Sequence, residues 1–187
     1  MFDPIGNSKT IAYTLNRTPK VVSSHELSPS PQQEIPASAV NDSAALYRII
    51  PNQQHVYKLI GRGMGTPSKL LFWNAGPIRR FFSSLFTGIP APLLRMYAHQ
   101  ADLLRVPGMQ ADWARLLFEV GIRNPSELEQ YAGNGIGSKI QRGALYGILT
   151  AKAIELAATE GRSYSPPSLE DLVQIASYSR GVGKKVS

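Results

Sequence analysis

The chain of 187 residues contains no cysteine. This absence excludes disulfide bonds, thiolate metal sites and cysteine nucleophiles, and it says nothing about the redox compartment. The sequence also lacks a run of about eighteen apolar residues that could cross a bilayer, and its start lacks the charged segment and apolar stretch of a secretory signal. We therefore expect an intracellular or organellar protein, soluble or peripheral to a membrane, that is neither secreted nor membrane-spanning.

Acidic residues are missing from a long internal stretch. Residues 43–101 contain none, although residues 1–89 carry nine basic and four acidic residues and residues 90–187 carry eleven and nine. The basic residues of the acid-free stretch are Arg48, Lys58, Arg62, Lys69, Arg79, Arg80 and Arg95. We therefore expect residues 45–91, a basic aromatic segment, to seek an anionic surface.

The first 44 residues contain five prolines and no sustained apolar period. Such a segment buries too little apolar surface to offset the entropy lost on ordering. We predict that residues 1–44 form an extended or disordered tail that wraps a partner. Residues 181–187 are predicted to form a short basic tail.

One amphipathic helix is predicted over residues 77–87, with Pro77 in its first turn and Gly88 at its C-cap. Five large apolar residues share one face: Ile78, Phe81, Phe82, Leu85 and Phe86. The opposite face is polar and carries Arg79 and Arg80. This pattern suits an interaction helix that meets a lipid interface or a partner groove, and it fits equally a helix packed on the protein's own core.

The second half of the chain shows helical periodicity throughout. Helices are predicted over residues 92–105, 110–120, 125–131, 138–160 and 168–178. Gly143, Gly147 and Ala151 recur every four residues, which predicts close packing against a neighbouring helix. The expected fold is all-α, a small helical domain over residues 92–180 preceded by the extended or disordered tail.

Two glycine-containing turns separate these predicted helices. Pro107 and Gly108 force a bend in the first, and the second places three glycines within residues 133–137. Two short helices joined by such a turn resemble the helix-hairpin-helix superfamily. The order of motifs over about residues 100–180 is similar to a bacterial family related to that superfamily and known only as a domain of unknown function. This resemblance brings no activity with it.

The resemblance implies that turn amides could hold nucleic-acid phosphates at the second turn. The candidate residues are Gly133, Gly135, Gly137, Ser138, Lys139 and Arg142. The first turn departs from the superfamily pattern, because Gln110 replaces the second glycine and Asp112 adds a negative charge. We expect no phosphate at the first turn.

The sequence offers little for catalysis. Its three histidines are isolated, and no glycine-rich segment has the spacing of a nucleotide-binding loop. We predict no catalytic residue, no metal site and no cofactor, and hence a protein that is not an enzyme.

Two classes of function remain open. The first is a non-catalytic scaffold or accessory subunit of a larger, membrane-associated or soluble protein assembly, which docks through the helical domain and wraps other subunits with the tail. The second is a nucleic-acid-binding protein that holds phosphate at residues 135–139. The weak charge of the helical domain and the altered first turn favour the scaffold.

Overall fold

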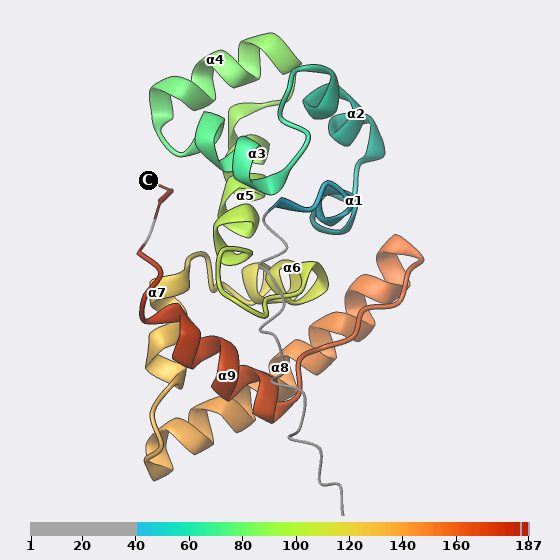
Figure 1. Cartoon of the computed structure of the whole chain (residues 1–187). Coiled ribbons are helices and arrows are strands. Elements are labelled where there is room, and N and C mark those ends of the chain that lie inside the picture. The colour runs from blue at the N-terminus through green and yellow to red at the C-terminus, as the bar shows by residue number, and fades with distance from the viewer. Residues whose placement is uncertain (1–40, 184, 187) are drawn as a thin grey trace, which may run out of the picture. The chain divides into compact units, whose positions relative to one another are not determined.

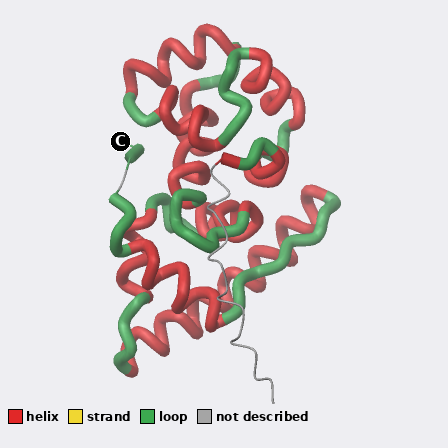
Figure 2. Tube along the Cα trace, in the orientation of Figure 1, coloured by secondary structure: helices red, strands yellow, loops and turns green. Residues whose placement is uncertain are grey.

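Helices and loops make up the part of the chain that the computed structural model describes, residues 41–183, 185 and 186, and no strand occurs there (Figure 2). The all-α prediction is therefore confirmed. The predicted N-terminal tail lies outside the described residues except for residues 41–44.

The helices follow one another with short connections (Figure 1). They are α1 (Ala44–Ile49), α2 (Gln53–Gly61), α3 (Pro67–Asn74), α4 (Pro77–Thr87), α5 (Ala91–Leu103), α6 (Ala111–Glu119), α7 (Pro125–Leu128), the 3-10 turn η2 (Glu129–Tyr131), α8 (Ile136–Glu160) and α9 (Leu169–Ser179). All six helices predicted from the sequence form. The one predicted over residues 125–131 is α7 continued by the 3-10 turn η2, and the ends of the other five are shifted by at most two residues. None of the described helices combines the length and the apolarity that crossing a bilayer requires.

Local sequence explains where these helices begin and end. Pro77 stands at the start of α4, where its missing N–H would have no partner in any case, and Gly88 ends the helix with a φ of 64°. Gly108 bends the chain between α5 and α6 with a φ of 78°, as predicted for that turn. Ser168 and Asp171 form a complete capping box at the start of α9.

The hydrophobic core runs across the domain boundary predicted at residue 92. Leu46, Ile49, Val56, Leu59 and Leu70 are fully buried in the same core as the later helices. These residues belong to the helices α1, α2 and α3, which are not among the helices predicted from the sequence. These helices are six to nine residues long, and helices this short depend on tertiary packing more than on their own periodicity.

Neighbouring helices pair in a way that places the candidate site. α3 and α4 pack against each other and both pack on α5, while α1 packs on α6. The C-terminal end returns to α5, where the buried Asp102 accepts a hydrogen bond from the backbone N of Lys185 (3.1 Å) and Val186 is buried. The predicted basic tail is therefore docked at residues 185 and 186.

The prediction of close packing along Gly143, Gly147 and Ala151 is wrong for the described residues. A Cβ added at Gly143 or Gly147 would meet no atom within 4 Å, and Ala151 is exposed. α8 buries the opposite side, through residues such as Leu145 and Leu149. The apolar residues of α8 thus divide between two faces, and Ile140, Ile148 and Ile154 are exposed.

Candidate functional site

α4 is attached to the domain by its polar face. Arg80, Ser83 and Thr87 are buried, with exposed fractions of 8%, 2% and 6%. Arg80 donates from Nε and Nη2 to the carbonyl of Asn74 (3.3 and 3.1 Å), and Ser83 Oγ donates to the carbonyl of Trp73 (3.3 Å). Carbonyls in the last turn of a helix lack donors within that helix. The polar side of α4 therefore completes the C-terminus of α3.

A further set of hydrogen bonds fixes the end of α4. Thr87 Oγ1 donates to the carbonyl of Ser83 (2.7 Å) and accepts from the backbone N of Ile89 (3.2 Å). Ser84 Oγ donates to the carbonyl of Ile89 (2.7 Å). Because Ile89 is itself fully buried in the core, these bonds hold the end of α4 against the domain.

The apolar face of α4 points to solvent. The exposed fractions of its side chains are 74% for Ile78, 63% for Phe81, 48% for Phe82, 69% for Leu85 and 56% for Phe86. Phe72 and Trp73 at the end of α3 are also exposed, at 58% and 46%. We call these seven residues the aromatic surface. Amphipathic helices ordinarily bury the apolar side, so α4 has the opposite orientation.

Ring contacts order the aromatic surface. Phe81 and Phe82 lie edge to face with centroids 5.8 Å apart, and the rings of Phe82 and Phe86 stack at 6.5 Å. Phe72 and Trp73 lie edge to face at 5.7 Å. These distances are those of favourable aromatic pairs. These contacts hold neighbouring rings of the aromatic surface against one another.

A basic pocket of about 420 Å³ adjoins the aromatic surface. It is lined by Ser68, Leu71, Phe72, Ala75, Arg79, Arg105 and Lys185. Arg79 donates to the carbonyl of Phe72 (3.1 Å), and its guanidinium lies 4.6 Å from the centroid of that ring. Phe72 and Arg79 thus connect the pocket with α4.

Asp102 holds the other cations of the basic pocket in place. Its Oδ1 accepts from Arg105 Nη1 at 2.7 Å, and its Oδ2 accepts from the backbone N of Lys185. Arg105 Nη1 also donates to the carbonyl of Gly183 (2.6 Å). This pocket is not predicted from the sequence, because nothing in the sequence pairs Arg105 with Lys185, eighty residues further along the chain.

The second glycine turn contains the residues predicted for phosphate binding, and contacts join Arg142 and Ser138 to Gly133. Arg142 is buried and donates to the carbonyls of Tyr131 and Gly133, the latter at 2.6 Å. Its guanidinium closes the turn from inside. Ser138 packs on Gly133, where an added Cβ would lie 2.3 Å from the hydroxyl oxygen. Lys139 is exposed.

The start of α8 itself remains open. Gly135 is the N-cap and supplies no side-chain hydrogen bond to the first helical N–H groups. α8 begins at Ile136, two residues before the predicted start, and Gly135, Ile136 and Gly137 are all exposed. At the first turn, Asp112 forms an ion pair with Arg48 (3.5 Å).

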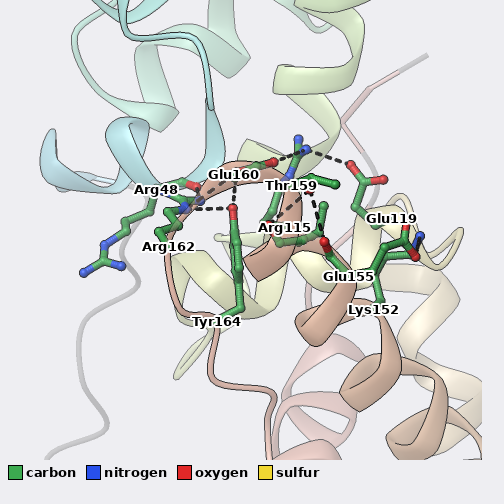
Figure 3. A network of polar contacts seen from close by, with 10 residues as sticks. Arg48, Arg115, Glu119, Lys152, Glu155, Thr159, Glu160, Arg162 and Tyr164 are labelled. Atoms are coloured by element: carbon green, nitrogen blue, oxygen red, sulfur yellow. Dashed lines mark hydrogen bonds and ion pairs between the residues drawn. The ribbon is translucent and has the colours of Figure 1, made fainter.

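A polar network joins α6, α8 and α1 (Figure 3). The buried Arg115 pairs with Glu119 (3.0 Å) and Glu160 (3.1 Å), and Glu160 accepts a hydrogen bond from the Tyr164 hydroxyl. Arg162 Nη1 donates to the carbonyl of Tyr47 on α1 (3.1 Å). These groups hold helix ends together.

Burial and the bond to Glu160 raise the pKa of Tyr164 to about 12. A tyrosine with this pKa stays protonated at neutral pH, so its hydroxyl remains a hydrogen-bond donor to Glu160. It does not act as a phenolate base there.

The two described histidines lie in separate environments. His55 contacts the hydroxyl of Tyr97 (2.9 Å), while the buried His99 donates from Nδ1 to the carbonyl of Arg123 (3.1 Å) and stacks on Phe118. Burial is the main cause that lowers the pKa of each, and Lys58 also lowers that of His55. Each ring has its own structural partner.

Comparison with known families gives one match, to a family described as Domain of unknown function (DUF4332), over residues 50–158. The match includes α2 to α6, α7 and most of α8. It begins some fifty residues before the span of the resemblance seen in the sequence and contains the aromatic surface. No curated protein and no solved structure matches the chain.

Proposed function

This chain belongs to the DUF4332 family, and we propose that it is a non-catalytic scaffold or accessory subunit that attaches to a larger assembly through the aromatic surface. The observation that carries this proposal is the orientation of α4, whose polar residues are buried and whose apolar residues are exposed. Large exposed apolar surfaces on soluble domains mark places of interaction.

The size of the aromatic surface supports attachment. Full burial of a Leu, Ile or Phe side chain stabilises by about 1.5 to 3 kcal/mol relative to exposure. Five such side chains lie on one face of α4. Burial of several such side chains at one interface offsets much of the cost of association, which is about 4 to 15 kcal/mol.

The helix-hairpin-helix resemblance is part of the same proposal. The two hairpins would be α5 and α6 around Gly108, and η2 and α8 around Gly135. In a scaffold their role is to dock on protein partners, and the tail of residues 1–44 would add contacts by wrapping other subunits. That tail is outside the described residues apart from 41–44.

Nucleic-acid binding at residues 135–139 is the second candidate. The exposed start of α8 without a side-chain cap favours it, because free helix N–H groups suit a phosphate. The hydrogen bonds of Arg142 to two carbonyls argue against phosphate binding. They occupy the guanidinium, which would otherwise be the strongest phosphate ligand among the candidate residues.

The proposal is tested in extract from the native cell, with the full chain carrying a tag. We expect the wild-type chain to elute in gel filtration with a large assembly, and the variant with Phe82→Asp and Phe86→Asp to elute at the size of the free chain. The matched control is Tyr57→Asp with Ile60→Asp, which changes exposed apolar residues of α2 instead and should leave elution unchanged. Elution of the α4 variant with the assembly would overturn the proposal.

A further inference from the structure

We propose that the partner of the aromatic surface is an anionic lipid bilayer, and that the basic pocket beside it binds the phosphate of a lipid headgroup. This inference rests on the proposed attachment function and names its partner.

The basic pocket has the chemistry of a phosphate site. Three cationic residues, Arg79, Arg105 and Lys185, line it. The acid beside them, Asp102, is fully buried and already accepts from Arg105 and from the backbone of Lys185. An excess of positive charge therefore faces the pocket, and guanidinium and ammonium groups are the side chains that bind phosphate.

Apolar groups form the rest of the basic pocket. Leu71, Phe72 and Ala75 line it together with the cations, and Ser68 adds a hydroxyl that lies 3.1 Å from that of Thr66. A free phosphate ion needs no apolar wall. A headgroup with its glycerol and the first part of its acyl chains uses both kinds of lining.

Phe72 and Arg79 connect the basic pocket with α4, and this connection determines how a bound lipid would be oriented. Phe72 belongs to the pocket and to the aromatic surface, and the Arg79 guanidinium lies over its ring. A lipid with its phosphate at Arg79 and Arg105 would extend its apolar part along Phe72 toward α4. Helices with aromatic and aliphatic residues on one side lie in a bilayer interface in this way.

Charge complementarity selects an anionic bilayer. Residues 43–101, which include α1 to α4 and α5 up to the residue before Asp102, contain no acidic residue. Lys58, Arg62, Lys69 and Arg95 are exposed in this stretch, in addition to Arg79. Basic groups beside an interfacial helix are attracted to anionic lipids, and neutral lipids give no such electrostatic attraction.

The test uses the full chain with vesicles of phosphatidylcholine alone and of phosphatidylcholine mixed with phosphatidylserine. We expect sedimentation with the mixed vesicles only, and loss of that binding in the variant with Phe82→Asp and Phe86→Asp. Lys185→Glu should weaken it about tenfold, because it reverses a charge near the headgroups. Lys152→Glu, the same change on α8 at a lysine that pairs with Glu155, is the matched control and should have little effect.

Three outcomes would overturn the inference. One is equal binding of both kinds of vesicle, and another is an effect of Lys152→Glu as large as that of Lys185→Glu. The third is binding of inorganic phosphate, seen as shifts of the Arg79 and Lys185 amide resonances, by a chain that binds no vesicle; this would leave a pocket for free phosphate. If vesicles are not bound but the α4 variant still leaves its native assembly, the lipid inference fails and the attachment function stands.

Discussion

Arg80 on α4 donates two hydrogen bonds to the carbonyl of Asn74, the last residue of α3. A cation at a helix C-terminus is favourable both as a donor and through the helix dipole. This contact fixes α4 with its polar side inward, and as a consequence the aromatic surface faces outward. The orientation of the candidate site depends on a residue that does not belong to that surface.

We predict that Arg80→Met lowers the free energy of unfolding by about 1.5 to 3 kcal/mol, the usual loss for buried hydrogen bonds that involve a charged group. Chemical denaturation of the full chain measures it. Arg79→Met is the control, because Arg79 is exposed and its replacement should cost much less. Equal losses for both variants would show that Arg80 has no special part in holding α4.

The stability of the protein should fall as the pH drops below 6.5. Burial lowers the pKa of His99 and of His55 from the ordinary value of 6.5, so the unfolded chain binds protons in a range where the folded chain does not. A single histidine can contribute a slope of at most about 1.4 kcal/mol per pH unit. Unfolding curves recorded on both sides of this pH measure the effect.

His99→Gln should reduce that pH dependence, because it removes one of the two groups. An unchanged slope in this variant would mean that other groups cause the acid sensitivity.

Gly147→Ala should stabilise the free chain by about 0.5 to 1 kcal/mol. An interior helical glycine costs that much relative to alanine, and the new Cβ would meet no atom within 4 Å. Gly161→Ala is the contrasting control and should destabilise, since Gly161 has a φ of +68°. Destabilisation by Gly147→Ala in thermal melts would reveal a close neighbour on that face of α8.

If the chain is a scaffold, Lys139→Glu should leave its affinity for DNA and RNA unchanged. Binding that falls with this substitution, and whose logarithm falls linearly with the logarithm of salt concentration, would favour the nucleic-acid function instead. Filter binding over a range of salt concentrations with mixed-sequence DNA and RNA distinguishes the two.

Much of the helical pattern follows from the sequence because proline, glycine and apolar spacing act locally. Pro77, Gly88 and the five apolar residues between them define α4, and Gly108 defines the first turn. α3 was not predicted because Leu70 to Trp73 form a continuous apolar run, which fits a helix and a strand equally.

The parts of the site that could not be predicted depend on tertiary contacts. The α4 pattern identifies the apolar face but not the side to which it turns, since that is decided by the bonds of Arg80 and Ser83 to α3. The basic pocket arises where Lys185 meets Asp102 across 83 positions. No local spacing connects residues so far apart.

The most direct test of the outward orientation of α4 is the free energy of unfolding of the full chain with Phe82→Asp and Phe86→Asp. We predict a change of about 0.5 kcal/mol or less for each substitution, as for other surface positions. Leu94→Ala on α5, a fully buried residue, gives the scale for a core position, about 2 to 5 kcal/mol. A loss of several kcal/mol in the α4 variant would show that this face is ordinary core and would contradict the account.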